Sequence, residues 1–334
     1  MTKLSCYCLL CVALFAGNSH AQGKKAIMNN NQKSNPLLCE PEKGACDMPG
    51  ATHSIATNAP APKTKPVRIV YFTDPICSSC WGVEPQLRKL KAEYGDFFEI
   101  EYRMGGLLPS WDVYNSGGIS KPSDVAHHWD EVSVHYDMPI DGDVWLEDPL
   151  PSSYPPSIAF KAAQMQDPKK ALQFLRRIRE MVFLEKKNIT KWEYLQNAAL
   201  TAGLDAEKMK QDLEGKAKQL FQEDLDMARR LGVRGFPTLF FTDTLNQQLM
   251  IYGARPYQQF EQNILYLCPE ATKKQLDNTP ESWFSLYPSL TTKEFSVLTG
   301  TSREQAEKTL SDLFEHKKLG KYPSKNGPLW KKIH

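Results

Sequence analysis

The run Cys77-Ser-Ser-Cys80-Trp81 stands between a strand-like and a helix-like segment, and it constrains the fold more than any other feature of this chain. Residues 67–72 before it are β-branched and aromatic, and apolar residues recur at helical spacing in 87–94 after it. A helix N-terminus offers free N–H groups and the positive end of the helix dipole, which favour a thiolate at the first sulfur. The pattern predicts a thiol pair that closes into a disulfide and reopens.

Two other interpretations of a lone Cys-x-x-Cys remain open at this point, half of a zinc site and a pair of structural thiols. Zinc needs two more ligands at matching spacing, and the other cysteines form no second Cys-x-x-Cys pair. We expect His127, His128 and His135 to be solvated or capping residues rather than metal ligands. The chain also lacks a glycine-rich phosphate loop, so the sequence predicts neither a metal nor a cofactor.

A glycine and a proline stand directly before an apolar segment far downstream. Residues 233–238 read Val-Arg-Gly-Phe-Pro-Thr, and Leu-Phe-Phe follows them. Proline has no N–H and fits poorly into a central strand, so its place at a strand start indicates either a special backbone state, such as a cis bond between Phe236 and Pro237, or an ordinary loop proline.

These two motifs, separated by a long helical stretch, resemble the DsbA-like branch of the thioredoxin superfamily. Four further segments are similar to its FrnE and Spx-adaptor subgroup, namely 74–77, 153–156, 179–190 and 252–257. The resemblance covers residues 66–270 and implies an α/β fold, a thioredoxin-like core with a large helical insertion, followed by a small C-terminal helical module.

The resemblance also implies roles for individual residues. Cys77 would be the nucleophile and Cys80 the resolving thiol. Pro237 would be a cis-proline that flanks the disulfide and offers backbone groups to an extended substrate, with Phe236 and Trp81 as further substrate-binding residues. The dipeptide between the cysteines, Ser-Ser, carries no cation, which favours a less extreme oxidant than relatives with a histidine there.

Residues 1–21 are typical of a secretory signal peptide. Lys3 precedes the apolar run 9–16, and small residues occupy the cleavage positions in 19–21. The apolar run is too short to span a membrane, and no later segment is long and apolar enough to do so. We therefore expect a periplasmic or secreted protein, with a cytoplasmic protein that has an apolar N-terminal extension as the alternative.

Residues 22–65 form a predicted flexible arm, rich in Asn, Lys, Pro, Ala and Thr. The arm contains Cys39 and Cys46, separated by a loop that includes a glycine. An exported compartment permits a structural disulfide between these two cysteines, and a mobile dithiol could also pass electrons to or from the Cys-x-x-Cys pair. We expect Cys268 to be buried as a small apolar residue.

The remaining chain divides into a thioredoxin-like domain, 66–272, and a C-terminal module, 280–334. Helical spacing predicts an insertion over about 107–232. Its expected helix starts are Ser123 as a cap, Asp167-Pro168, Thr190 and Asp205. Two short helices joined by a glycine turn make the module similar to helix-turn-helix and winged-helix modules. Acidic residues in the second of these helices oppose phosphate contact, so we expect packing or partner docking rather than DNA binding.

Two functions fit these observations. The first is an exported thiol-disulfide oxidoreductase or isomerase, whose partners are client proteins with thiols or disulfides and a redox partner protein. The second is a cytosolic, client-binding protein of the Spx-adaptor type, which presents a client to a protease. A formal net charge of +2 indicates neither nucleic acid nor an anionic surface as a partner.

Overall fold

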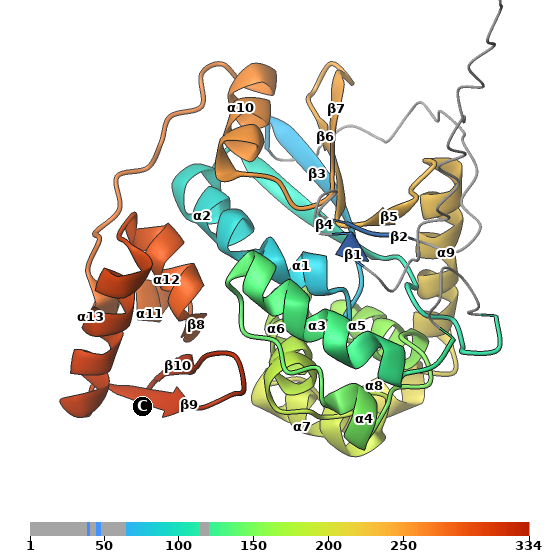
Figure 1. Cartoon of the computed structure of the whole chain (residues 1–334). Helices are drawn as coiled ribbons and strands as arrows, with labels where there is room; N and C mark the ends of the chain where they lie inside the picture. Colours follow the sequence, from blue (N-terminus) through green and yellow to red (C-terminus); the bar gives the residue numbers. More distant parts are fainter. Residues whose placement is uncertain (1–38, 41–44, 48–64, 114–119, 334) are drawn as a thin grey trace, which may run out of the picture. The chain divides into compact units, whose positions relative to one another are not determined.

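The computed structural model describes residues 39–40, 45–47, 65–113 and 120–333, and Figure 1 shows the arrangement of their elements. The predicted signal peptide and most of the predicted arm lie outside these residues. Among the residues that are described, no helix is both long and apolar enough to cross a membrane.

A four-stranded mixed sheet forms the centre of the fold, in the order β4-β3-β6-β7. Its strands are β3 (Val67–Thr73), β4 (Phe98–Met104), β6 (Thr238–Thr242) and β7 (Gln248–Tyr252). Strand β3 pairs in parallel with β4 and antiparallel with β6, and every residue of β3 is buried. The sequence predicts a strand, helix, strand unit with strands at 67–72 and 97–102, an antiparallel pair at 239–241 and 248–251, and a closing helix at 257–267. All three are present, as expected for a thioredoxin-like sheet.

Alternate residues of β3 serve two different hydrophobic cores. Val67, Ile69 and Tyr71 face the cluster that contains α2 (Glu84–Tyr94) and α10 (Tyr257–Leu267). Val70 and Phe72 belong to a larger cluster with the helical insertion. This alternation follows from the two-residue period of a strand and explains why β3 is buried on both faces.

The helix after the Cys-x-x-Cys motif is divided into two. Helix α1 (Ser78–Gly82) ends at Val83, and α2 begins at Glu84 with Pro85 in its first turn. The sequence predicts one helix with a kink at this proline. A proline is favoured in the first turn of a helix because the N–H it lacks would have no intrahelical partner there, so a new helix starts here.

Helices α3 to α9 lie between β4 and the short strand β5 (Gly235–Phe236). Their bounds are α3 Ser123–Tyr136, α4 Val144–Glu147, α5 Tyr154–Gln166, α6 Pro168–Leu184, α7 Trp192–Thr201, α8 Ala206–Asp212 and α9 Lys216–Arg230. Asp167 and Asp205 cap α6 and α8 as predicted. Ser123 is the first residue of α3 and makes no cap, and Gly215 separates α8 from α9 where the sequence indicates one helical stretch.

The C-terminal module contains a sheet that the sequence did not predict. Its elements are α11 (Pro280–Leu286), β8 (Ser289–Thr291), α12 (Thr292–Thr299), α13 (Arg303–Glu315), β9 (Leu319–Tyr322) and β10 (Leu329–Lys332). The three strands form an antiparallel sheet in the order β8-β10-β9. The predicted glycine turn is present, because Gly300 ends α12 in the left-handed conformation. In the chain, helices α12 and α13 lie between β8 and the strand pair β9 and β10.

A third small sheet joins the arm to the core. Strand β1 (Cys39–Glu40) pairs antiparallel with β2 (Ala45–Asp47), and β2 pairs antiparallel with β5. Two short stretches of the predicted arm therefore form strands, and they lie in one sheet with β5, the strand that precedes Pro237, as Figure 1 shows.

Candidate thiol-disulfide exchange site

Cys77 and Cys80 occupy the first turn of α1. Cys77 is the N-cap residue, with an extended backbone, and its Sγ accepts a hydrogen bond of 3.1 Å from the backbone N–H of Cys80. Both cysteines are fully buried, as is Cys268 at the end of α10. The sequence prediction of two sulfurs at a helix N-terminus matches this geometry.

The two thiols differ in their acidity. Burial raises the pKa of Cys77 well above its ordinary value of 9.0, and the charges of Cys80 and Asp74 raise it further. Burial also acts to raise the pKa of Cys80, but the hydrogen bond from Cys77 and the positive charge of Arg179 outweigh it and lower that pKa. Cys77 is therefore the harder of the two thiols to ionise while it is buried, so Cys77 has to be uncovered before it can act as the nucleophile.

Asp74 lies at the end of β3 and fixes the loop that leads to Cys77. Its carboxylate accepts hydrogen bonds from the backbone N–H of Ile76 at 3.1 Å, from that of Leu107 at 2.8 Å and from the hydroxyl of Ser153 at 2.8 Å. Burial still raises the pKa of Asp74 to about 6. A carboxyl group that titrates near neutrality therefore stands beside the thiol pair.

Arg179 brings a buried positive charge from α6 to the site. Its guanidinium pairs with Glu84 and donates to the Thr73 hydroxyl at 2.6 Å and to the Asp74 carbonyl at 3.3 Å. Only 1% of Arg179 is exposed. Sequence reasoning missed the roles of Arg179, Asp74 and Ser153, although all three lie in segments on which the family resemblance rests.

Phe236 and Pro237 connect β5 to β6 with a cis peptide bond, the state that the resemblance implies for this position. The Phe236 ring lies against Gly105, where a Cβ atom would approach it to 1.8 Å. The Pro237 carbonyl accepts a hydrogen bond of 2.8 Å from the Gly253 N–H. Phe236 shares the large hydrophobic cluster with Cys77, so the structure brings the two sequence motifs into one core.

Trp81 follows Cys80 directly and packs into the core of the insertion. The side chain is fully buried, it stacks on Phe183 with ring centroids 5.5 Å apart, and its N–H donates to the Pro139 carbonyl at 3.0 Å. The Arg176 guanidinium lies over its ring. The substrate-binding role of Trp81 stays a prediction.

The described residues contain no group of three or more metal-ligating side chains. His127 and His128 both approach the Glu131 carboxylate, at 3.2 and 3.8 Å, and His135 packs against Tyr136. The two contacts with Glu131 join residues at i,i+4 and i,i+3 spacing along α3.

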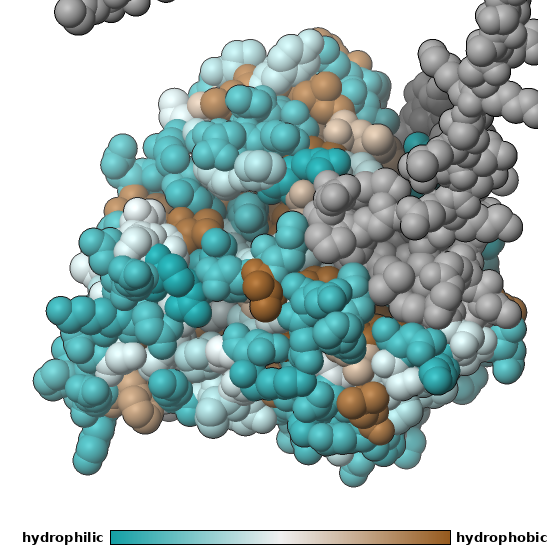
Figure 2. All heavy atoms as spheres, viewed as in Figure 1, coloured by the Kyte–Doolittle hydropathy of each residue, from teal (hydrophilic) through white to brown (hydrophobic). Residues whose placement is uncertain are grey.

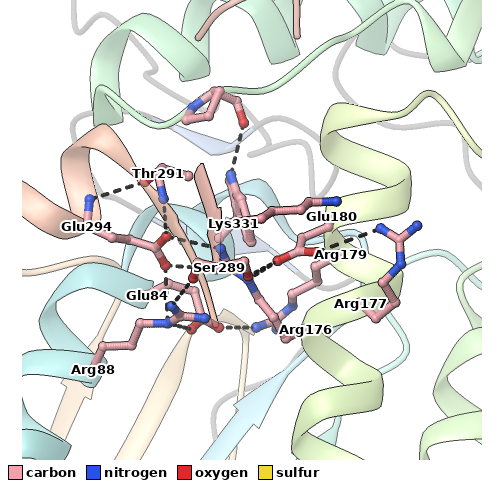
Figure 3. A network of polar contacts seen from close by, with 12 residues as sticks. Glu84, Arg88, Arg176, Arg177, Arg179, Glu180, Ser289, Thr291, Glu294 and Lys331 are labelled. Atoms are coloured by element: carbon pink, nitrogen blue, oxygen red, sulfur yellow. Dashed lines mark hydrogen bonds and ion pairs between the residues drawn. The ribbon is translucent and has the colours of Figure 1, made fainter. Parts of the chain in front are cut away.

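A network of arginines and carboxylates joins the core to the C-terminal module, as Figure 3 shows. Glu294 of α12 is fully buried and binds Arg176 through two hydrogen bonds of 2.8 and 3.0 Å. Arg88 of α2 approaches the same carboxylate at 3.2 Å. A cavity of about 740 Å³ opens beside this network, between α2, α6 and the module.

Comparison with known proteins agrees with this geometry. A family profile described as "Thioredoxin" matches residues 71–262. The "ClpXP adapter protein SpxH" of Halalkalibacterium halodurans is 35% identical over 302 residues, which is 89% of this chain and 97% of the relative. The protein of the same name from Bacillus subtilis is 32% identical over 274 residues, or 80% and 90% of the two chains.

A solved structure titled as a putative protein disulfide isomerase from Nitrosomonas europaea superimposes with a TM-score of 0.51 at 21% identity. The superposition covers 61% of this chain and 96% of that one, and it concerns the fold alone. The profile match, the full-length similarity and the Cys-x-x-Cys at the N-terminus of α1 lead to one assignment. The chain belongs to the thioredoxin family, together with the SpxH proteins.

Proposed function

We propose that this protein is a client-binding adaptor of the SpxH type, which holds a client polypeptide for a partner protease. The observation that carries this proposal is the extent of the similarity. The isomerase-like neighbour corresponds to 61% of the chain, whereas the adaptor relative aligns over 89% of it. The shared sequence therefore extends beyond the thioredoxin core that a disulfide enzyme requires.

The attachment of the C-terminal module supports the same conclusion. The module binds the core through Glu294, and further hydrogen bonds join the Arg88 guanidinium to the Ser289 carbonyl at 2.8 Å and the Tyr287 hydroxyl to the Arg88 carbonyl at 2.8 Å. An adaptor needs two surfaces in a defined relation, one for its client and one for its partner. A module fixed to the core by buried ion pairs supplies such a relation.

A degradation assay tests the adaptor function. Purified full-length protein is added to ClpXP with Spx as the probe client, and we expect client degradation to accelerate. The Cys77→Ser variant should accelerate it equally, because holding a client does not require exchange. The adaptor proposal fails if the wild-type protein neither binds Spx nor changes the rate of its degradation.

A second candidate function, thiol-disulfide exchange, is favoured by the N-cap position of Cys77 with the Cys80 N–H at 3.1 Å from its sulfur. In the reducing direction the Cys77 thiolate attacks a client disulfide and displaces one client thiol. The Cys80 thiolate then attacks the Cys77 sulfur and displaces the second client thiol. The client gains two electrons and two protons, and Cys77–Cys80 becomes a disulfide.

Insulin reduction tests the exchange. We expect activity in the wild type and in Cys268→Ser, which removes a buried thiol at the end of α10, and no activity in Cys77→Ser. Activity that is indifferent to Cys77 would exclude exchange at this site. Cell fractionation separates the two cellular settings, because an exported oxidoreductase requires the predicted leader to act and an SpxH-type adaptor works beside its protease.

A further inference from the structure

The arrangement of β1, β2 and β5 gives the Cys77–Cys80 pair a reaction partner inside the same chain. We propose that Cys46 exchanges disulfides with Cys77, and that Cys39 resolves the resulting mixed disulfide. This inference rests on the exchange function proposed above, and it names the partner of that site.

The register in which β2 pairs with β5 places Cys46 beside the segment before Pro237. Cys46 lies directly opposite Phe236, and Asp47 lies opposite Gly235, in an antiparallel pair. Phe236 immediately precedes Pro237, the segment whose backbone the family resemblance assigns to an extended substrate. Directly opposed residues of an antiparallel pair have Cα atoms about 4.5 to 5.5 Å apart. The chain thus places one of its own cysteines in the strand position that a substrate would occupy.

The second part is the contact between β2 and α1. The elements that lie against α1 include β2, along with α2 and α3, and Cys77 is the N-cap residue of α1. A three-residue strand therefore touches both the segment before Pro237 and the helix that carries the thiols. Cys77 is fully buried in this arrangement, although an exchange centre has to present its sulfur to a partner. A partner already seated on the site reconciles these two facts.

The third part is the position of Cys39. The residue opposite Cys46 on β1 is Cys39, and directly opposed residues lie within the Cα separation that a disulfide needs, about 4.4 to 6.8 Å. Cys39 and Cys46 thus sit where they can form a disulfide with each other. A structural staple would require only this pairing and would not require Cys46 to lie opposite Phe236.

The exchange balances without any external reagent. When the Cys77–Cys80 pair is oxidised and the arm is reduced, the Cys46 thiolate attacks the Cys77 sulfur and the Cys80 thiolate leaves. The Cys39 thiolate then attacks the Cys46 sulfur, and the Cys77 thiolate leaves. A disulfide forms between Cys39 and Cys46, and two electrons and two protons move to the Cys77–Cys80 pair. The reverse steps carry electrons to the arm.

A trapping experiment on the full-length chain tests this exchange. The double variant Cys39→Ser, Cys80→Ser lacks both resolving thiols, so a Cys46–Cys77 disulfide accumulates in a glutathione redox buffer. Proteolysis without reduction, followed by mass spectrometry, identifies the linked peptides. The matched control is Cys46→Ser, Cys80→Ser, in which the remaining arm cysteine lies on β1, one strand further from β5. We expect at least about tenfold less cross-linking in the control, because a strand held beside its target has a high effective concentration.

The outcomes separate the two proposals. A dominant Cys46–Cys77 link supports the internal exchange. If Cys77 forms a mixed disulfide with glutathione and none with Cys46, the internal exchange is wrong and the exchange function remains. If Cys77 reacts with neither partner in the double variant, nor in the same variant without residues 22–64, both proposals are wrong.

Discussion

Asp74 couples the stability of the fold to pH. Its pKa is about 6 in the folded chain and 3.8 ordinarily, so the folded state binds the proton more tightly. The stabilisation is complete below pH 3.8 and is lost as the pH rises through about 6. Between pH 5 and 7.5 we expect the wild type to lose roughly 1 kcal/mol of unfolding free energy more than Asp74→Asn, which cannot titrate.

Urea unfolding at the two pH values measures this difference. Asp112→Asn changes an exposed aspartate and should follow the wild type. The same variant of Asp74 also removes a negative charge that raises the pKa of Cys77, so alkylation of Cys77 at pH 7.5 should become faster. Parallel pH profiles for wild type and Asp74→Asn would show that the buried carboxyl does not titrate in this range.

Arg179 stabilises negative charge on Cys80, which is the charge that forms when Cys80 prepares to resolve a mixed disulfide. Arg179→Met removes the cation and should raise the pKa of Cys80. We expect a mixed disulfide of Cys77 with a fluorescent thiol to be released about threefold to tenfold more slowly, as the resolving thiolate becomes scarcer. Stopped-flow fluorescence follows the release.

The variant Arg179→Lys distinguishes charge from packing. Lysine keeps the positive charge but cannot reproduce the forked hydrogen bonds to Thr73 and Glu84. Most of the wild-type rate should therefore remain in Arg179→Lys. Equal slowing in both variants would assign Arg179 a purely structural role.

At the scale of elements, β2 lies against α1, the helix whose N-cap residue is Cys77. Removal of residues 22–64 takes away the strand that lies against α1 and β5, so Cys77 should become accessible and its pKa should fall. We expect iodoacetamide to modify Cys77 at least about tenfold faster in the shortened chain, as loss of burial favours the thiolate. Mass spectrometry of the tryptic peptides gives the rate for each cysteine.

Cys268 is the internal control for this comparison. It is buried at the end of α10, in the cluster on the other face of the sheet, and its reactivity should stay unchanged. A parallel rise at Cys268 would mean that the deletion loosens the whole core. An unchanged rate at Cys77 would mean that elements other than β2 cover it.

Elements with a regular spacing of buried apolar residues were predictable from the sequence. The apolar run of β3, the two motifs and α10, which spans Tyr257–Leu267 as predicted, are local signals. The sequence did not predict strands β8, β9 and β10, because each has three or four residues and no clear alternation of apolar and polar side chains. Only their pairing with one another defines them as strands.

The candidate site was predictable only in part, for a related reason. Residue type and spacing in the sequence indicate the chemistry of Cys77, Cys80 and Pro237. Arg179 reaches the site from a helix 105 residues after Asp74 in sequence, and no local pattern relates the two. Strand β2 likewise lies near the site because it pairs with β5, which comes almost 190 residues later in the sequence. Strand pairing is a non-local contact, so no local pattern indicates it.

At the scale of the whole molecule, polar contacts are more prominent than any exposed apolar face. Figure 2 shows mostly hydrophilic residues on one face, with hydrophobic ones as small separate spots. The exposed large hydrophobic residues include Val134 and Leu146, which lie on different helices. Scattered exposure of this kind is normal for a protein surface. A buried long-range contact is the network between the core and the C-terminal module.

Glu294 is the centre of that network. Its carboxylate accepts from Arg176 and from the Thr291 N–H at 2.7 Å, which caps α12, and Arg88 lies 3.2 Å away. Burial acts to raise the pKa of Glu294, but Arg176 and Arg88 outweigh it and lower that pKa. The folded state thus favours the carboxylate, and this stabilisation is present above pH 4.5 and lost as the pH falls through the lower folded value.

Glu294→Gln should release the module from the core. The change leaves Arg176 and Arg88 buried without their shared anion, and removal of one partner from a buried ion pair costs about 3 to 5 kcal/mol. Because the module has its own hydrophobic cluster, around Trp283 and Trp330, it should remain folded after it separates. We expect faster trypsin cleavage between α10 and α11, where Lys273 and Lys274 lie, and two urea transitions in place of one. Glu147→Gln breaks an exposed pair with Lys186 and should leave both measurements unchanged. Retention of a single transition in Glu294→Gln, at the wild-type urea concentration, would show that the remaining polar and hydrophobic contacts hold the module in place without this carboxylate.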